Sequence, residues 1–219
     1  MSEEHRCIAI FGGSFDPVHV GHVALADIFA KLLCPDELRL IPAGNPWQKP
    51  TLQASAKDRL AMLQLAFGQR PYPITIDAQE IARQGATYTI DTLRAIRAEV
   101  GPRASLFFLI GADQLQQLAS WKEWRALFDF AHICAASRPG FALDATHVPS
   151  EVSQEFARRA APLEQLRNTP SGSSYLVTDL ALDVSATEVR AALQRAELPT
   201  SMVLPAVLDY LKDHHLYQH

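Results

Sequence analysis

The sequence predicts a single α/β domain in which a doubly wound, Rossmann-like parallel sheet carries helices on both faces. Short apolar runs alternate with amphipathic segments along the 219 residues, which is the pattern of successive βαβ units. The run Ser105–Ile110 is continuously apolar, as a strand buried on both faces should be. The hydrophobic content of 48% and the charged content of 20% are ordinary for a globular chain of this length.

The first part of the chain supplies a clear strand–helix–strand pattern. The apolar run Cys7–Phe11 is expected to be a buried strand, and Val20–Leu33 a helix, because apolar residues recur on one side of it. A second strand is expected at Glu37–Ile41. A loop is expected over Pro42–Ser55, where three prolines and a glycine interrupt regular structure. Lys57–Phe67 is then expected to be a helix.

The alternation continues to the last helices. A short strand is expected at Ile74–Asp77, followed by a helix at Thr89–Val100 with its apolar residues in register. The later expected elements are the strands Ser105–Ile110, Ile133–Ala136 and Tyr175–Thr178 and the helices Ala186–Arg195 and Pro205–His214. Glu151–Leu166 is a candidate surface helix within a less readable stretch. We expect one domain over 1–219, in which 180–219 forms a helical C-terminal part that carries a second phosphate-binding motif.

Composition limits the classes of function. The formal net charge of −4 argues against a protein that coats nucleic acid. No apolar run approaches the ~18 residues that a membrane-spanning helix needs, and the polar, acidic start is unlike a signal peptide. Three widely spaced cysteines, Cys7, Cys34 and Cys134, are expected to be reduced packing residues. We expect a cytoplasmic protein, either a monomer or a weak homodimer, with no nucleic-acid or membrane partner.

The stretch from Gly12 to His22, GGSFDPVHVGH, predicts a phosphate site where a strand leads into a helix. The glycines allow close approach of a ligand, and the helix start offers unpaired N–H groups. His19 and His22, three residues apart in the first helical turn, can face the same ligand. The dinucleotide fingerprint and the P-loop are both absent. The alternatives are surface or capping histidines, or a metal pair, for which no third ligand stands at a convincing spacing.

This stretch resembles the nucleotidylyltransferase superfamily that carries the H-x-G-H motif. Over essentially its whole length the chain most resembles the bacterial nicotinate mononucleotide adenylyltransferases. The resemblance implies transfer of AMP from ATP to nicotinate mononucleotide, giving nicotinate adenine dinucleotide and pyrophosphate in NAD biosynthesis. It implies that His19 and His22 are catalytic donors to phosphate, and that Gly12, Gly13, Ser14 and Phe15 bind ATP. It also implies Mg²⁺ bound mainly through the ATP phosphates, with no protein metal ligand named.

A second set of candidate ligand groups starts a later helix, at Val184–Arg190. Ser185 can cap this helix, Thr187 can offer a hydroxyl or an N–H group, and Arg190 can form a charge-assisted fork to phosphate. Read alone, this is an ordinary capped helix. It resembles the adenylyltransferase motif I-S-S-T-x-I-R, which grips the triphosphate, so Ser185, Thr187 and Arg190 are expected to bind ATP. The chain departs from that motif at Ala186, and no role is carried to this position.

Further candidates follow other strands. Gly111 and Asp113 come directly after Ser105–Ile110, where a backbone and a carboxylate can reach a ribose; the alternative is a turn in which Asp113 caps the next helix. The resemblance assigns both residues to ATP. It assigns Trp121 to the nicotinate ring, with Trp124 as packing, and Thr87 to the nicotinate carboxylate. From the residues alone, Trp121 could belong to the core and Thr87 could simply start a helix.

Lys49 and Arg138 are the last ATP-binding candidates. Lys49 lies in the expected loop and Arg138 follows an expected strand, and a solvated surface cation is the alternative for both. The family often has Pro-Pro-His-Lys where this chain has PWQK, so Gln48 replaces the histidine.

Competing functions are another adenylyl- or cytidylyltransferase, such as the pantetheine-phosphate enzyme, a nucleotide-binding module without catalysis, and a metal-binding protein. The histidine-containing tail is expected to be the polar end of the last helix.

Overall fold

The computed structural model describes residues 5–46, 52–137, 143, 148–178, 180 and 184–218. Within these ranges six strands form one sheet, in the order β3-β2-β1-β4-β5-β6, and all neighbouring strands are parallel. The strands are β1 (Cys7–Gly13), β2 (Glu37–Pro42), β3 (Ile74–Ile76), β4 (Ser105–Gly111), β5 (His132–Ala136) and β6 (Ser174–Val177). The prediction of a parallel α/β sheet is confirmed, and each expected strand is present within a residue or two of its expected ends.

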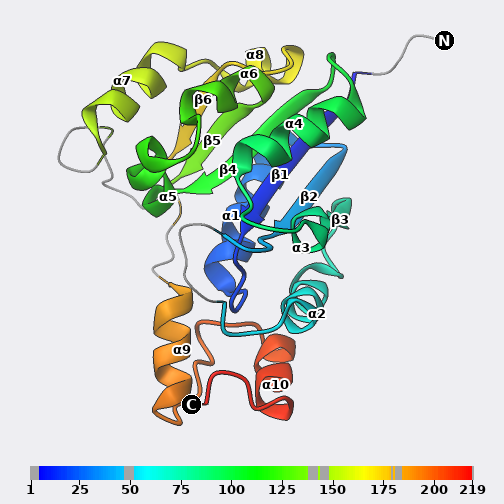
Figure 1. The fold of residues 1–219 in the computed structure, drawn as a ribbon, viewed down its shortest axis with the longest axis vertical. Helices are drawn as coiled ribbons and strands as arrows, with labels where there is room; N and C mark the ends of the chain where they lie inside the picture. Colours follow the sequence, from blue (N-terminus) through cyan, green and yellow to red (C-terminus); the bar gives the residue numbers. More distant parts are fainter. Residues whose placement is uncertain are drawn as a thin grey trace.

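The helices of the described residues connect these strands (Figure 1). The longer ones are α1 (Val20–Leu33), α2 (Ala56–Phe67), α4 (Thr89–Val100), α7 (Ser150–Arg159), α9 (Ala186–Gln194) and α10 (Pro205–Asp213). Short helices are α3 (Gln79–Ala82), α5 (Ala112–Gln117), α6 (Leu127–Phe130) and α8 (Leu163–Asn168), with the 3-10 turns η1 (Leu118–Ser120) and η2 (Trp124–Ala126). The expected long helices are confirmed. The sequence analysis did not anticipate α3, α5 and α6, because four to six residues hold too little periodicity to be recognised.

Side chains of each strand alternate between two cores, one on each face of the sheet. Along β1, Ala9 and Phe11 belong to one core and Ile8 and Ile10 to the other. Buried residues of α1, α2, α9 and α10 fill the first core, and those of α4, α5, α6 and α7 fill the second. The sheet is therefore doubly wound, as predicted, and its central strands are apolar because both faces are covered.

The strand order reverses direction between β1 and β4, which are neighbours in the sheet. In open α/β sheets the crevice at this switch point, beyond the carboxyl ends of the strands, is where ligands bind. Phe11 of β1 pairs with Leu109 of β4, so the glycines that end the two strands, Gly13 and Gly111, lie at the same level. The fold thus brings the first motif and the Gly111 segment to one edge.

Two expectations about particular segments are wrong. Glu151–Leu166 is not one helix but two, α7 and α8, because the first ends at Arg159 and Pro162, in an extended conformation, is the N-cap of the second. Proline interrupts a helix by removing an N–H donor. Cys34 is not a packing residue: it ends α1 in a left-handed conformation and is exposed, whereas Cys7 and Cys134 are buried. All three cysteines are free thiols.

The last two helices, α9 and α10, lie at the end of the molecule beyond α1, and α10 packs against α2 (Figure 1). Their buried residues join the core that also contains Phe15 and Val18 of the first motif. The backbone N–H of Val20, at the start of α1, donates to the carbonyl oxygen of Met202 at 2.9 Å. Among the described residues, no helix has the length and apolar character to cross a membrane.

Candidate active site

The turn between β1 and α1 is built around a buried phenylalanine. Phe15 has a left-handed backbone (φ 48°) and its side chain is fully buried, with its ring 5.5 Å from that of Phe11 and 5.0 Å from that of His22. A Cβ at Gly13 would lie 3.0 Å from the Phe15 ring, so glycine is what lets the ring fold under the turn. Because the Phe15 side chain points into the core, this predicted ATP-binding residue can offer a ligand only its backbone.

His19 and His22 do face each other, although His19 stands just before α1 rather than in its first turn. The two imidazole rings stack with their centroids 3.7 Å apart. The His19 backbone N–H donates to Nδ1 of His22 at 3.2 Å, so in the neutral His22 ring the proton is on Nε2 and this atom is a donor. A Cβ at Gly21 would lie 3.1 Å from the His19 ring. The arrangement directs imidazole donors to the N-terminus of a 14-residue helix.

The second motif meets the first at this point. The site where a Cβ would stand on Gly21 is 3.5 Å from the carbonyl oxygen of Val184. The Arg190 guanidinium donates to the backbone oxygen of Asp16 at 2.7 Å and to the Thr187 hydroxyl at 3.2 Å. Residues separated by more than 160 positions thus lie in contact at the start of α1, where Arg190 adds a cation. The structure brings together the two motifs that the sequence placed at opposite ends of the chain.

Ser185 caps α9, as its position predicts. Its hydroxyl accepts from the Glu188 N–H at 3.2 Å and donates to the Glu188 carboxylate at 2.8 Å, which in turn accepts from the Ser185 N–H at 2.8 Å. This reciprocal capping box fixes the start of the helix. The Ser185 hydroxyl is therefore bonded within its own helix start, Arg190 is the α9 side chain that contacts the turn, and Thr187 accepts from Arg190.

Three buried or nearly buried residues that the sequence analysis did not single out hold the β1–α1 turn by hydrogen bonds: Asp16, Arg59 and Tyr217. The Asp16 carboxylate is buried and accepts from the N–H groups of Gln53 and Ala54 at 2.7 and 2.9 Å. It also accepts from the Tyr217 hydroxyl at 2.5 Å. The Arg59 side chain is 2% exposed and donates to the carbonyl oxygen of Ser14 at 2.9 Å. Burial lowers the pKa of Arg59, and the nearby Asp16 carboxylate opposes that effect.

These supporting residues differ in how visible they are in the sequence. Asp16 stands inside the motif and could have been recognised as a buried acceptor. Arg59 falls in a helix that looked like an ordinary amphipathic one. The tail is not simply the polar end of the last helix, because Tyr217 is buried against Asp16; no local pattern gives such a long-range contact.

The Gly111 segment lies across the switch point. Gly111 precedes α5 and its N–H donates to the Gln114 side chain at 3.3 Å. A Cβ at Gly111 would lie 2.6 Å from the Asp113 carboxylate, so the glycine lets this exposed carboxylate fold back over the end of β4. Asp113 stands in the first turn of α5, whose N-cap is Gly111 and has no side-chain cap hydrogen bond, so the alternative in which Asp113 caps this helix is wrong.

Thr87 and Trp121 are both placed with buried polar atoms that have no partner among the described residues. The Thr87 N–H donates to the carbonyl oxygen of Asn45 at 2.9 Å, while its hydroxyl oxygen is buried without a hydrogen bond. Trp121 packs edge-on against Phe108 with ring centroids 6.2 Å apart, and its Nε1 is likewise buried without one. Buried polar groups normally find a partner, so both atoms mark places where a ligand could bind. Trp124 is a core residue, as expected.

Some candidates lie elsewhere. Lys49 and Arg138 fall outside the described residues, as do Trp47 and Gln48.

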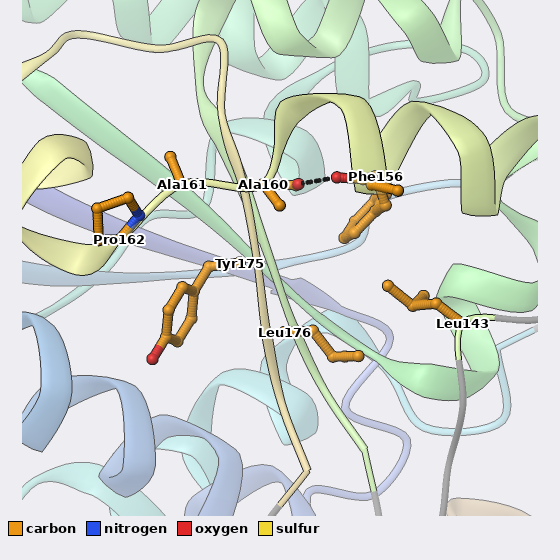
Figure 2. Close-up of a pocket in the computed structure, with 9 residues that line it drawn as sticks. Leu143, Phe156, Ala160, Ala161, Pro162, Tyr175 and Leu176 are labelled. Carbon is orange, nitrogen blue, oxygen red and sulfur yellow. Dashed lines mark hydrogen bonds between the residues drawn. The ribbon is translucent and has the colours of Figure 1, made fainter.

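An apolar hollow of about 420 Å³ lies beside the edge strand β6, between α7 and the start of α8 (Figure 2). Its described lining, which includes Phe156, Pro162 and Tyr175, contains none of the predicted site residues.

Comparisons with known proteins identify the family of this chain. The cytidylyltransferase-like family model matches residues 10–192, which span both motifs. The chain is 64% identical over 218 residues to a probable nicotinate-nucleotide adenylyltransferase of Herminiimonas arsenicoxydans, covering 100% of both chains. It is 44% identical to one of Laribacter hongkongensis, covering 96% of this chain and 94% of the relative.

A solved structure shows the same fold. The Plasmodium falciparum nicotinic acid mononucleotide adenylyltransferase complexed with NaAD superposes with a TM-score of 0.75 at 21% identity, covering 97% of this chain and 98% of the other. At that identity the likeness concerns the fold. The full-length sequence relatives and the family match carry the assignment: this chain belongs to the nicotinate-nucleotide adenylyltransferases, within the cytidylyltransferase-like family.

Proposed function

We propose that this chain transfers AMP from ATP to nicotinate mononucleotide at the carboxyl edge of the sheet, with the β1–α1 turn and α9 as the triphosphate site. The observation that carries the proposal is the meeting of the two motifs: Arg190 of α9 bonds to the backbone of Asp16 beside the stacked pair His19 and His22. Family membership supports the reaction, and it implies pyrophosphate and nicotinate adenine dinucleotide as products.

The chemistry requires positioning and charge stabilisation rather than a protein nucleophile. A 5′-phosphate oxygen of nicotinate mononucleotide attacks the α-phosphorus of ATP, a P–O bond forms in line, and the bond to the β-phosphate oxygen breaks to release pyrophosphate. We assign to His22 Nε2 the role of donor to the phosphate oxygens on which charge develops, because His22 Nδ1 already accepts from the His19 N–H and Nε2 therefore carries the proton of the neutral ring. Arg190 adds a fixed positive charge at the same place.

Thr87 and Trp121 are the proposed acceptor side of the site. Their unpartnered buried atoms support this assignment, since a bound pyridine nucleotide could satisfy them. A neighbouring solved structure of Plasmodium falciparum was complexed with NaAD and another with APC, which supports nucleotide substrates for this chain. Gly111 and Asp113, at the end of β4, are proposed to face the ATP ribose.

Mg²⁺ is proposed as the metal. Among the described residues no group of three or more His, Cys, Asp or Glu side chains could hold an ion, so the proposal takes its ligands from the ATP phosphates and water, which is how this ion commonly binds. The bound ion would neutralise phosphate charge. We also propose a cytoplasmic location and a monomer or weak homodimer.

Pyrophosphate release from ATP and Mg²⁺ tests the proposal, measured side by side with nicotinate mononucleotide and nicotinamide mononucleotide. Release with the acid form alone is the expected result. Equal release with both would keep the mechanism and change the substrate to both forms. No release with either would contradict the proposed reaction and point to another phosphate acceptor, such as phosphopantetheine.

A further inference from the structure

The segment that follows α10 turns back toward the β1–α1 turn. His215 and Tyr217 both have left-handed backbones, with φ of 51° and 62°, a conformation that is unfavourable for residues with a Cβ. The Leu216 N–H bonds to the carbonyl oxygen of Leu211 at 3.0 Å, which closes the end of the helix. The chain adopts this conformation twice in three residues, and the result is that the Tyr217 side chain is buried instead of exposed.

Tyr217 completes a set of contacts that holds the phosphate-binding turn from several directions. Its hydroxyl donates to Oδ1 of Asp16, the same oxygen that accepts from the Ala54 N–H, while Oδ2 accepts from Gln53. Burial and the neighbouring Asp16 carboxylate raise the pKa of Tyr217 far above its ordinary value, so the hydroxyl keeps its proton at every assay pH. One carboxylate therefore joins the turn, the chain that enters α2, and the last described residues.

We infer that Tyr217 is a positioning residue for ATP: by donating to Asp16, it holds the Ser14–Asp16 backbone in the shape that receives the triphosphate. This inference rests on the proposed ATP site. Tyr217 itself is placed behind the turn and acts through Asp16, whose own carbonyl oxygen is held by Arg190 from the other side. Without the hydroxyl, Asp16 loses a charge-assisted hydrogen bond and the turn can relax.

The chain offers a matched control elsewhere. Tyr72 donates to Oδ1 of Asp27 at 2.6 Å, and burial together with that carboxylate raises the pKa of Tyr72 as well. Asp27 lies eight residues along α1 from His19, which is about 12 Å at the helical rise. Tyr72→Phe thus removes the same kind of tyrosine–aspartate bond at the edge of the same core, because Tyr72 is only partly buried against it, and leaves the turn untouched.

The experiment compares Tyr217→Phe with Tyr72→Phe and wild type. KM for both substrates is measured by pyrophosphate release, and ATP affinity is measured by calorimetry without the acceptor. We expect Tyr217→Phe to raise KM and Kd for ATP about fivefold to tenfold, which is less than the full effect of a hydrogen bond to a charged group because Tyr217 acts on ATP only through Asp16. KM for nicotinate mononucleotide should stay within about twofold. The unfolding temperature should fall in both variants, and more in Tyr217→Phe, because the Asp16 carboxylate is buried whereas the Asp27 carboxylate is 40% exposed and also pairs with Arg70.

An unchanged ATP affinity in Tyr217→Phe would overturn the inference. An equal loss of ATP affinity in Tyr72→Phe would overturn it too, since the effect would then be general destabilisation. A wild-type protein that binds ATP but releases no pyrophosphate contradicts the proposed reaction alone, because the calorimetric comparison still tests Tyr217.

Discussion

The two sides of the candidate site are built differently. On the phosphate side, Asp16, Arg59 and Arg190 are bonded to one another's backbone or to neighbouring segments, so the protein itself fixes the turn. On the acceptor side, Thr87 and Trp121 each keep a buried polar atom without a partner among the described residues. Arg59 Nε, on the phosphate side, is also buried without a partner, but the Arg59 guanidinium still bonds to Ser14 through another nitrogen. At Thr87 and Trp121, in contrast, the single polar atom of each side chain has no partner, so we expect the substrate to satisfy it.

The largest expected effect comes from removing a donor on the preorganised side. His22→Ala should lower kcat by about 100-fold or more, the usual result of losing one donor to a developing charge. Steady-state pyrophosphate release measures it. His22→Gln keeps an N–H at the end of a similar side chain and should recover part of the rate. Turnover near that of wild type in His22→Ala would remove His22 from the catalytic groups.

Arg190→Lys should cost about tenfold to thirtyfold in kcat/KM for ATP. Lysine keeps the charge but lacks the planar fork, so it cannot bond at once to the Asp16 carbonyl oxygen and the Thr187 hydroxyl and still face phosphate. The matched control is Arg195→Lys, because the exposed Arg195 contacts Glu197 beyond the end of the same helix. Kinetics with ATP varied distinguish the two, and equal behaviour would argue that charge alone matters at position 190.

Thr87→Val tests the acceptor side. It should weaken the binding of nicotinate mononucleotide without lowering the thermal stability of the protein. Valine has nearly the shape of threonine and removes a buried hydroxyl that has no partner among the described residues, so thermal stability should stay the same or rise. KM for nicotinate mononucleotide should increase about fivefold, with KM for ATP unchanged. Thr75→Val, at an exposed position of β3, is the control. A clear loss of stability in Thr87→Val would mean that the hydroxyl serves the fold.

The smallest expected effect is a pH dependence of folding stability that arises from His132, outside the candidate site. His132 of β5 is fully buried, its Nδ1 accepts from the Ser173 N–H, and its Nε2 bonds to the Thr169 carbonyl oxygen, which suits the neutral ring. Burial lowers the pKa of His132 below the usual 6.5. A lowered histidine pKa favours the folded state above about pH 6.5, and this contribution is lost as the pH falls toward the folded-state pKa.

Thermal unfolding at pH 7 and pH 5 measures this contribution. Wild type should lose more stability over that interval than His132→Gln, by about 1 kcal/mol, or roughly 2–4 °C for a chain of this size. His214→Gln, which changes an exposed histidine of the last helix's end, should behave as wild type. The same pH response in wild type and His132→Gln would show that other groups carry it.

Much of the fold was readable because its signals are local. The continuous apolar runs predicted β1, β4 and β5, and their burial on both faces explains the runs. The boundary errors have local causes as well: Pro162 divides one expected helix, and α5 is too short to show a period. The site residues that the sequence predicted are the motif glycines, His19 and His22. They could be recognised because the end of a strand and the start of a helix both depend on a few neighbouring residues.

By itself, the sequence determined the parallel α/β architecture and the order of its strands along the chain, and it predicted a phosphate site at the first motif. Only the tertiary structure decided that Val184 and Arg190 reach that motif, that Arg59 bonds beneath Ser14, and that the tail returns to Asp16. The physical reason is how far apart in the sequence the contacting residues lie. Helices, turns and strand exits follow from periodicity and backbone preference over a few residues. The contact between Asp16 and Tyr217 joins positions 201 residues apart, and the packing of the whole chain creates it.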